Sequence, residues 1–331
     1  MHPTFSVIFL TTLIGVGQGL FLALFSAQAY GMAKLLPQQD GSFFAVGSFI
    51  ALLFLLGGLF AAVFHLGKPS YMFTRAWRGM TQWRTSWLSR ELIAMPAMMG
   101  LTFLYGVFHW FGWDANLYGW EVNGALVSGQ LSLTVGILGV VGALGLFVCT
   151  GMIYAAIKFL QEWSSPLTVV NYFVLGTASG FSCAAVYAAY RAPELTHFFG
   201  GWAIALTVVG LLTRAASLLR NARIKYKSTV QTAIGVRHTK VQQKAMGFMG
   251  GSYNTRDYNH GKSFSFLKSV KWIFLLLAFV VPAILLSIGV ANTDGNLLLL
   301  AFMTQYVGLL FERWFFFAQA NHPQNLYYQT I

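Results

Sequence analysis

Long apolar runs without charge alternate with short polar or charged connections along the whole chain. Eight runs contain no Asp, Glu, Lys or Arg, and they cover 1–33, 41–67, 92–113, 122–157, 163–190, 195–213, 272–293 and 295–311. A bilayer core takes about 20 apolar residues per helix, so each run predicts one transmembrane helix. We place the core of the fourth helix at 128–150. The polar turn at 292–296 predicts a tight hairpin between the last two helices.

The continuous apolar character of these runs favours helices over strands. A membrane barrel would show alternating segments of about 10 residues, and strands are therefore not expected. With 56% hydrophobic and only 9% charged residues, the composition nearly excludes a soluble enzyme, which carries about 25% charge. We predict an all-α integral membrane protein: an eight-helix transmembrane bundle that forms a single anchor domain over 1–331. The first run lacks a basic start and a cleavage site, so we interpret it as a retained helix.

The basic residues fall almost entirely on one side of the predicted bundle. Eight spans put both termini on that side, and of the 21 Lys and Arg only Lys34 and Arg191 fall on the other side. Positive residues favour the cytoplasm, so we predict that both termini are cytoplasmic and that the protein is multi-pass in a bacterial inner membrane. The basic loop 220–271 suits anionic lipid or a docked partner. The net charge of +12 does not by itself indicate nucleic-acid binding, and we do not expect nucleic acid as a partner.

Motifs for a resident metal or a hydrolytic centre are missing from the sequence. No Cys-x-x-Cys, Walker, dinucleotide-binding or Ser-His-Asp pattern occurs, and the two cysteines, Cys149 and Cys183, lie in apolar runs. His109 and His197 lie on the side opposite the termini, where two histidines could hold haem b, but no haem motif supports this. We predict no metal in this chain, so any catalytic redox centre belongs to another chain.

Residues 65–91 carry the most informative polar pattern. His65 ends the second run, and Trp and Arg then alternate up to Ser89, Arg90 and Glu91, which open the third run. Trp and Arg at a membrane boundary usually anchor a helix at the interface. Ser89 and Glu91 could equally cap the third helix. Ionisable groups at helix ends that face a bundle tend to be functional.

The number of spans that precede a residue decides on which side of the membrane it lies. By this count several such groups lie at one membrane level, namely His65, Arg90, Glu91, Tyr154, Glu312 and Arg313. Helix ends collect charge by chance as well, but apolar walls with a few convergent polar groups also suit a quinone. A His can hydrogen-bond a carbonyl and pass a proton, and a carboxylate can relay protons from water. We predict catalytic roles for His65, Glu91 and Glu312. We predict quinone binding by His65, Arg78, Arg90, Tyr154 and Arg313.

The sequence also resembles a known family in the same stretch. Residues 65–69 (HLGKP) and 86–91 (SWLSRE) are similar to the signature of DmsC-type anchor subunits of molybdopterin oxidoreductases; 17–18 (GQ) and 312–313 (ER) resemble further family positions. The resemblance implies a heterotrimer with an iron–sulfur subunit and a molybdopterin catalytic subunit. It implies that the anchor binds ubiquinone or menaquinone and no metal, and that the functional His of the family is His65.

The basic side of the bundle, where the signature residues lie, is predicted to face the cytoplasm. Within the family, this orientation favours a resemblance to the membrane subunits of cytoplasm-facing sulfite dehydrogenases. That likeness implies catalytic partners on the cytoplasmic side and sulfite oxidation coupled to quinone reduction. One alternative is the quinol-oxidising anchor of a dimethyl sulfoxide or polysulfide reductase. An alternative of another class is a secondary transporter, which would predict internal repeats that the sequence does not show.

Overall fold

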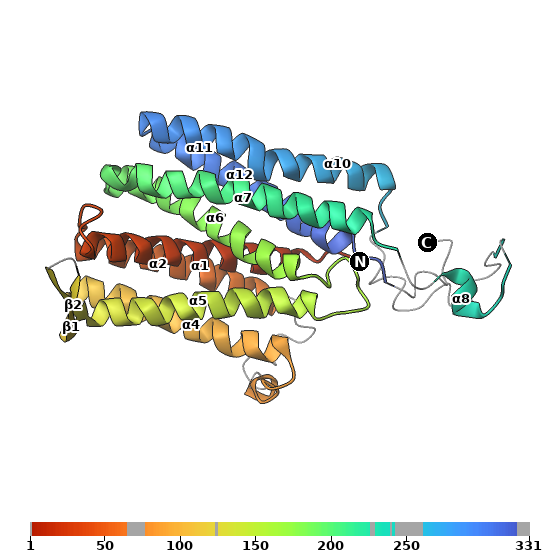
Figure 1. Ribbon diagram of the computed structural model, residues 1–331, viewed down its shortest axis with the longest axis horizontal. Helices are drawn as coiled ribbons and strands as arrows, with labels where there is room; N and C mark the ends of the chain where they lie inside the picture. Colours follow the sequence, from red (N-terminus) through yellow and green to blue (C-terminus); the bar gives the residue numbers. More distant parts are fainter. Residues whose placement is uncertain are drawn as a thin grey trace.

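The computed structural model describes residues 2–64, 77–122, 125–225, 229–238, 240–241 and 261–322. Within these residues, eight helices are long and apolar enough to cross a membrane. They are α1 (Phe5–Met32), α2 (Gly41–Val63), α4 (Trp87–Phe111), α5 (Leu131–Ala155), α6 (Pro166–Arg191), η1–α7 (Pro193–Ala222), α10–η2–α11 (Phe264–Asn292) and α12 (Gly295–Ala318). They run side by side along one axis (Figure 1), and the predicted eight-helix bundle is confirmed.

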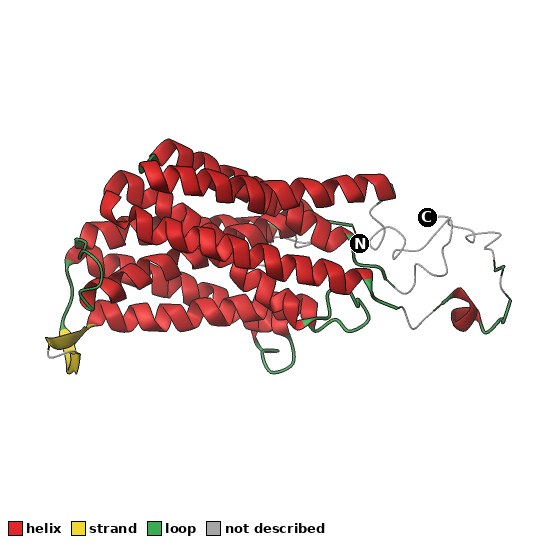
Figure 2. Ribbon diagram, turned by 45° about the horizontal axis from the view of Figure 1, so that its top comes forward, coloured by secondary structure: helices red, strands yellow, loops and turns green. Residues whose placement is uncertain are grey.

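The two ends of the bundle differ in character (Figure 2). We call the end where α1 begins and α12 ends the basic end, because Arg and Lys gather there; it includes the short helix α8 (Val230–Ile234). We call the other end the hairpin end, after strands β1 (Asn116–Val122) and β2 (Ala125–Gln130). The sequence predicts that the basic end is cytoplasmic.

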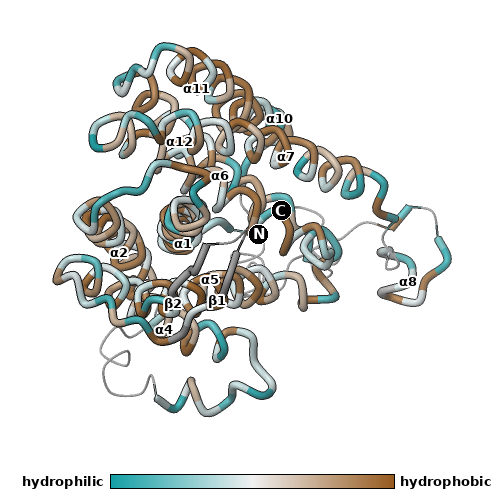
Figure 3. Tube along the Cα trace, turned by 60° about the vertical axis from the view of Figure 1, so that its left-hand side comes forward, coloured by the Kyte–Doolittle hydropathy of each residue, from teal (hydrophilic) through white to brown (hydrophobic). Residues whose placement is uncertain are grey.

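Helices α1 and α6 occupy the middle of the bundle, and the other helices surround them (Figure 3). In both, 78% of the most apolar window is buried inside the protein, against 28–44% in the other six spans. Helices α1, α2, α4 and α5 form one four-helix half, and α6, α7, α10–α11 and α12 form the other. The halves meet mainly where α1 packs against α6.

Glycines allow the two central helices to approach at backbone distance. Gly19 of α1 faces the carbonyl of Gly176, and Gly180 of α6 faces the backbone of Gly19. Without a strong hydrophobic force between helices in lipid, close packing of small residues is a main source of association. This crossing therefore joins the two halves.

Several helix ends differ from the predicted ones. Helix α4 begins at Trp87, and Ser86 rather than Ser89 caps it, because the Ser86 hydroxyl accepts the Ser89 amide at 3.4 Å. The runs 195–213 and 295–311 extend to Ala222 and Ala318. Both extensions contain buried charged residues, which a search for uncharged runs excludes.

Residues 125–130 of the fourth run form strand β2 rather than helix and pair with strand β1, so the expectation that strands are absent was wrong there. The strands pair antiparallel, with Trp120 opposite Val127, and α5 starts only at Leu131 instead of 128. The hairpin follows α4 and precedes α5, so it lies beyond the spans. Backbone groups at a strand edge can be satisfied by water there, unlike within hydrocarbon.

The last two spans form the predicted hairpin. Thr293 takes a left-handed conformation with φ 51°, and the Asp294 carboxylate accepts the amides of Asn296 and Leu297 at 2.9 and 3.3 Å. The segment η2 (Leu276–Val280) is a π-helical turn whose backbone packs directly against Gly308 of α12. Pro282 follows it near the start of α11, where its missing N–H is tolerated.

Candidate functional site

A cluster of three charged side chains is buried at the basic end, between α7 and α12. The Arg214 Nε lies 2.7 Å from one Glu312 oxygen, and an Arg313 guanidinium nitrogen lies 2.9 Å from the other. The side chains of Arg214, Glu312 and Arg313 are 2%, 0% and 5% exposed. Buried charges survive only when paired, so Glu312 neutralises part of the charge of two arginines at once. We call these three residues the ionic cluster.

Two stacked tyrosines extend the ionic cluster toward the first half of the bundle. The Arg313 guanidinium lies 3.9 Å from the centre of the Tyr172 ring of α6, a cation–π contact. Tyr172 in turn stacks on Tyr154 of α5 at a centroid distance of 5.7 Å. Tyr154 also contacts the rings of Trp163 and Phe316 edge-on. The tyrosine pair therefore connects α12 to α5 across α6.

Glu91 of α4 lies at the other side of this tyrosine pair. Its carboxylate is buried and accepts the Thr150 hydroxyl of α5 at 2.6 Å. Thr150 lies one helical turn before Tyr154 on α5, so it connects Glu91 to the tyrosine pair. The structure thus brings together four of the predicted residues, namely Glu91, Tyr154, Glu312 and Arg313.

Two further predicted site residues, Arg78 and Arg90, are not part of this group. The Arg90 guanidinium donates to the carbonyls of Trp83 and Arg84 at 2.8 and 2.9 Å and covers the Trp87 ring. Arg78 is exposed, with its guanidinium 5.3 Å from the Trp77 ring. His65 lies outside the described residues. The two arginines therefore face the surface at the basic end.

Sequence reasoning missed Arg214, Tyr172 and Glu162, which all line the cavity beside the ionic cluster. A signal for Arg214 does exist in the sequence. Thr207, Gly210, Arg214 and Ser217 follow at helical spacing and are all buried on one face of α7. The search for uncharged runs instead assigns Arg214 to the basic loop that follows. Tyr172 gives no such signal, because a tyrosine within an apolar run looks like a packing residue.

The cavity beside the ionic cluster is small. Its volume is about 10 Å³, and its lining includes the Asn171 amide, which donates to the Ser217 hydroxyl at 2.7 Å. That space holds about one water molecule, whereas ligand pockets measure roughly 300–1,000 Å³. A ring-sized ligand therefore does not fit within this cavity.

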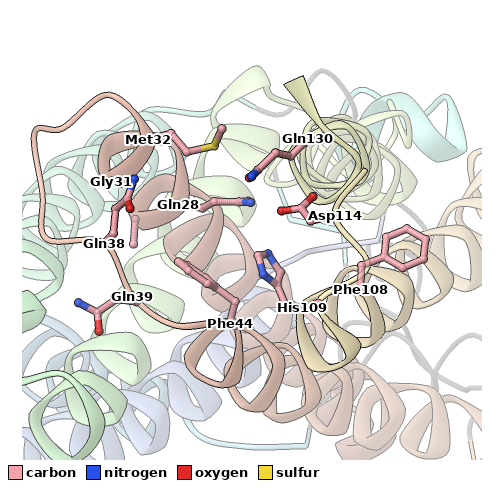
Figure 4. A pocket seen from close by; sticks show the side chains of 13 residues that line it. Gln28, Gly31, Met32, Gln38, Gln39, Phe44, Phe108, His109, Asp114 and Gln130 are labelled. Atoms are coloured by element: carbon pink, nitrogen blue, oxygen red, sulfur yellow. The ribbon is translucent and has the colours of Figure 1, made fainter. Parts of the chain in front are cut away.

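A larger cavity opens at the hairpin end (Figure 4), and we call it the hairpin-end cavity. It measures about 290 Å³, and its lining includes Gln28, Phe44, His109, Asp114 and Gln130. At its rim the Ser42 hydroxyl and the Phe43 amide donate to Asp40, which keeps the pKa of that carboxyl below its usual value. This cavity is one of the described features that the sequence did not predict.

A chain of hydrogen bonds fixes the polar wall of the hairpin-end cavity. The Tyr105 hydroxyl donates to Gln28 at 2.8 Å, and the Gln28 amide donates to the Ser132 hydroxyl at 2.9 Å. The Ser132 hydroxyl and amide then donate to the two Asp114 oxygens at 3.2 and 3.1 Å. Helices α1, α4 and α5 thus hold these side chains in one arrangement.

His109 reaches the same cavity from α4. Its ring packs against Phe44 and Tyr105 at centroid distances of 4.8 and 4.5 Å, and its Nε2 is buried without a hydrogen-bond partner. His197 is not among the residues that line the cavity. No group of three or more His, Cys, Asp or Glu suited to a metal ion occurs among the described residues. The prediction of no metal in this chain remains a prediction.

An apolar groove of about 320 Å³ lies at the basic end between α1, α10 and α12. Its lining includes Phe5, Phe9, Phe266, Phe311 and Trp314. The shape and apolar lining suit a hydrocarbon chain, but they offer almost nothing to a carbonyl or hydroxyl group.

Comparisons with known proteins agree with these features. Residues 1–328 match the family described as DMSO reductase anchor subunit (DmsC). The chain is 55% identical to a sulfite dehydrogenase subunit from Allochromatium vinosum over 331 residues, which cover the full length of both chains.

Proposed function

The chain belongs to the DmsC family and is a membrane anchor subunit of a molybdopterin oxidoreductase, and from this we propose that it carries the quinone half-reaction of the complex. An iron–sulfur subunit would deliver electrons at the basic end, and a molybdopterin catalytic subunit would supply them. The name of the relative from Allochromatium vinosum, a sulfite dehydrogenase subunit, supports sulfite as the electron donor. With sulfite as the donor, quinone would be reduced rather than quinol oxidised.

The observation that supports this proposal is the gathering of buried titratable groups at the basic end. Quinone reduction takes up two protons with two electrons, so proton carriers must reach into the apolar bundle. Glu91 and Glu312 would relay protons, because both carboxylates are buried inside the bundle, one against Thr150 and the other against two arginines. Because the cavity beside the ionic cluster is small, the quinone ring would lie outside it, and His65, Arg78, Arg90, Tyr154 and Arg313 are the proposed contacts.

Replacing Glu91 by Gln tests the proton relay. Gln keeps the shape of the side chain and a hydrogen-bonding partner for Thr150, but it cannot carry a proton. We expect quinone-coupled sulfite oxidation by the purified complex to fall by roughly a hundredfold or more, as for the loss of a general acid or base. Sulfite oxidation with ferricyanide, which bypasses this subunit, should keep its rate.

Glu194→Gln is the matched control, since Glu194 is an exposed carboxylate at the hairpin end that accepts the Gln39 amide at 2.7 Å. It should behave as the wild type. Normal quinone reduction by Glu91→Gln would remove this residue from the mechanism. Absence of molybdopterin and iron–sulfur subunits from the purified complex would overturn the proposed assembly.

The predicted orientation has its own test. An alkaline phosphatase fused after Ile331 should be inactive, because this reporter works only outside the cytoplasm, and a green fluorescent protein at the same place should fluoresce. The reverse pattern would place the basic end outside and, with it, the catalytic partners. A fusion in the 116–130 hairpin should give the opposite result to the fusion at residue 331.

A further inference from the structure

We propose that the hairpin-end cavity is a second binding site, which takes the oxygen-bearing ring of a quinone or quinol. The proposal does not depend on the site at the basic end. The volume of the hairpin-end cavity, about 290 Å³, is close to the lower limit for small-molecule pockets, roughly 300 Å³. It is thus far larger than the cavity of about 10 Å³ beside the ionic cluster.

The free nitrogen of His109 points to a ligand with a hydrogen-bonding group. Figure 4 shows the His109 ring turned toward Gln28 and Asp114, inside the cavity. Its Nε2 is buried without a hydrogen-bond partner, and leaving such a buried group unpaired is unfavourable. A hydroxyl or carbonyl on the ligand would satisfy it, according to the tautomer of the imidazole.

The charges of the lining exclude an anion such as sulfite or sulfate. Asp114 contributes a carboxylate, and none of the described residues that line the cavity is Lys or Arg. An anion buried beside that carboxylate would lack a counter-charge, and burying an unpaired charge is strongly unfavourable. A neutral ligand with a few oxygen atoms fits, because the amides of Gln28 and Gln130 can each donate or accept.

The surroundings of the cavity indicate a ligand that comes from the membrane. Trp110, Phe111 and Trp113 are 57%, 59% and 56% exposed, and they flank Gly112, which lines the cavity. Exposed aromatic rings at a helix end mark the lipid–water interface. Phe44 offers an apolar ring at the inner side of the cavity. An amphipathic ring compound that dissolves in lipid matches both features.

Photolabelling of the whole purified complex with an azido-ubiquinone tests this inference. In the wild type, mapped peptides should carry label in segments 27–44 and 108–114. His109→Phe keeps the ring packing on Phe44 and Tyr105 but removes Nε2, so labelling there should fall roughly fivefold or more, the effect of one hydrogen bond. His109→Gln, which restores a hydrogen-bonding group, should recover a large part of the labelling.

Controls separate this inference from the function proposed above. His197→Phe changes a histidine at the same end that does not line the cavity, and it should label as the wild type. Glu91→Gln should keep the hairpin-end label although its quinone turnover is lost. Label confined to the basic end, or undiminished in a folded His109→Phe complex, overturns the second site and leaves the proposed function standing. Label confined to the hairpin end, with normal turnover in Glu91→Gln, supports the second site and overturns the proposed function.

Discussion

Replacing Glu312 by Gln should destabilise the protein by roughly 3–5 kcal/mol, because two buried arginines lose their shared carboxylate. Glu312 is fully buried and lies within 2.9 Å of both guanidinium groups. An amide can accept a hydrogen bond from Arg214 or Arg313, but it cannot neutralise either charge. Thermal or denaturant unfolding of the purified complex would measure the loss. Quinone-coupled turnover should be lost in whatever fraction stays folded.

A double variant distinguishes the effect of the unpaired arginine charges from the effect of the missing proton relay. Glu312→Gln combined with Arg214→Met removes one of the two unpaired charges and should recover part of the stability. The remaining Arg313 keeps its contact with the Tyr172 ring. Quinone-coupled turnover should not recover, since the carboxylate is still missing. An unfolding midpoint of Glu312→Gln close to that of the wild type would contradict the buried ion pairs described here.

Replacing Gly19 by Leu should prevent the two halves of the bundle from joining. A Cβ at this position would collide with the Gly176 carbonyl and would lie 2.9 Å from the Thr177 Cα, so only movement of the backbone could relieve the contact. Overpacking against side chains costs about 1–3 kcal/mol, and backbone offers less room to adjust. We expect little or no folded, monodisperse complex on size-exclusion chromatography in mild detergent.

Gly145→Leu is the matched control for the crossing of α1 and α6. Gly145 lies within α5, is exposed on the outer surface, and a Cβ there meets no atom within 4 Å. Leu has the higher helix propensity, so this variant should be as stable as the wild type or slightly more stable. Equal yields of folded complex from the two variants would show that the glycine contact does not hold the halves together.

Most of the fold could be predicted from the sequence because lipid permits few solutions. Uncharged runs of about 20 residues located all eight spans and the turn at 292–296. The same criterion ended α7 at residue 213 and α12 at residue 311, because it stops a run at every charged residue. Arg214 and Glu312 are buried as an ion pair between two helices, and the sequence of either run alone does not indicate this pair. The β-hairpin was missed because strand β2 is uncharged and continuous with the fourth run.

The candidate site could be predicted only in part. Span parity gives the membrane level of a residue, and it gathered Glu91, Tyr154, Glu312 and Arg313 correctly at one end of the bundle. It does not give the direction in which a side chain points, so Arg90 was grouped with residues that it does not contact. The hairpin-end cavity depends on how α1, α2 and α4 end relative to one another, which no pattern in the sequence specifies.

The central position of α1 and α6 also sets an order of events during synthesis. The ribosome delivers α1 first, but the helix that covers its glycine face starts only at Pro166. Until that helix emerges, the glycine face of α1 must rest against lipid or the insertion machinery, and a chain that stops before residue 166 would leave it open. A chain interrupted within this interval would therefore lack the packing partner of its central helix.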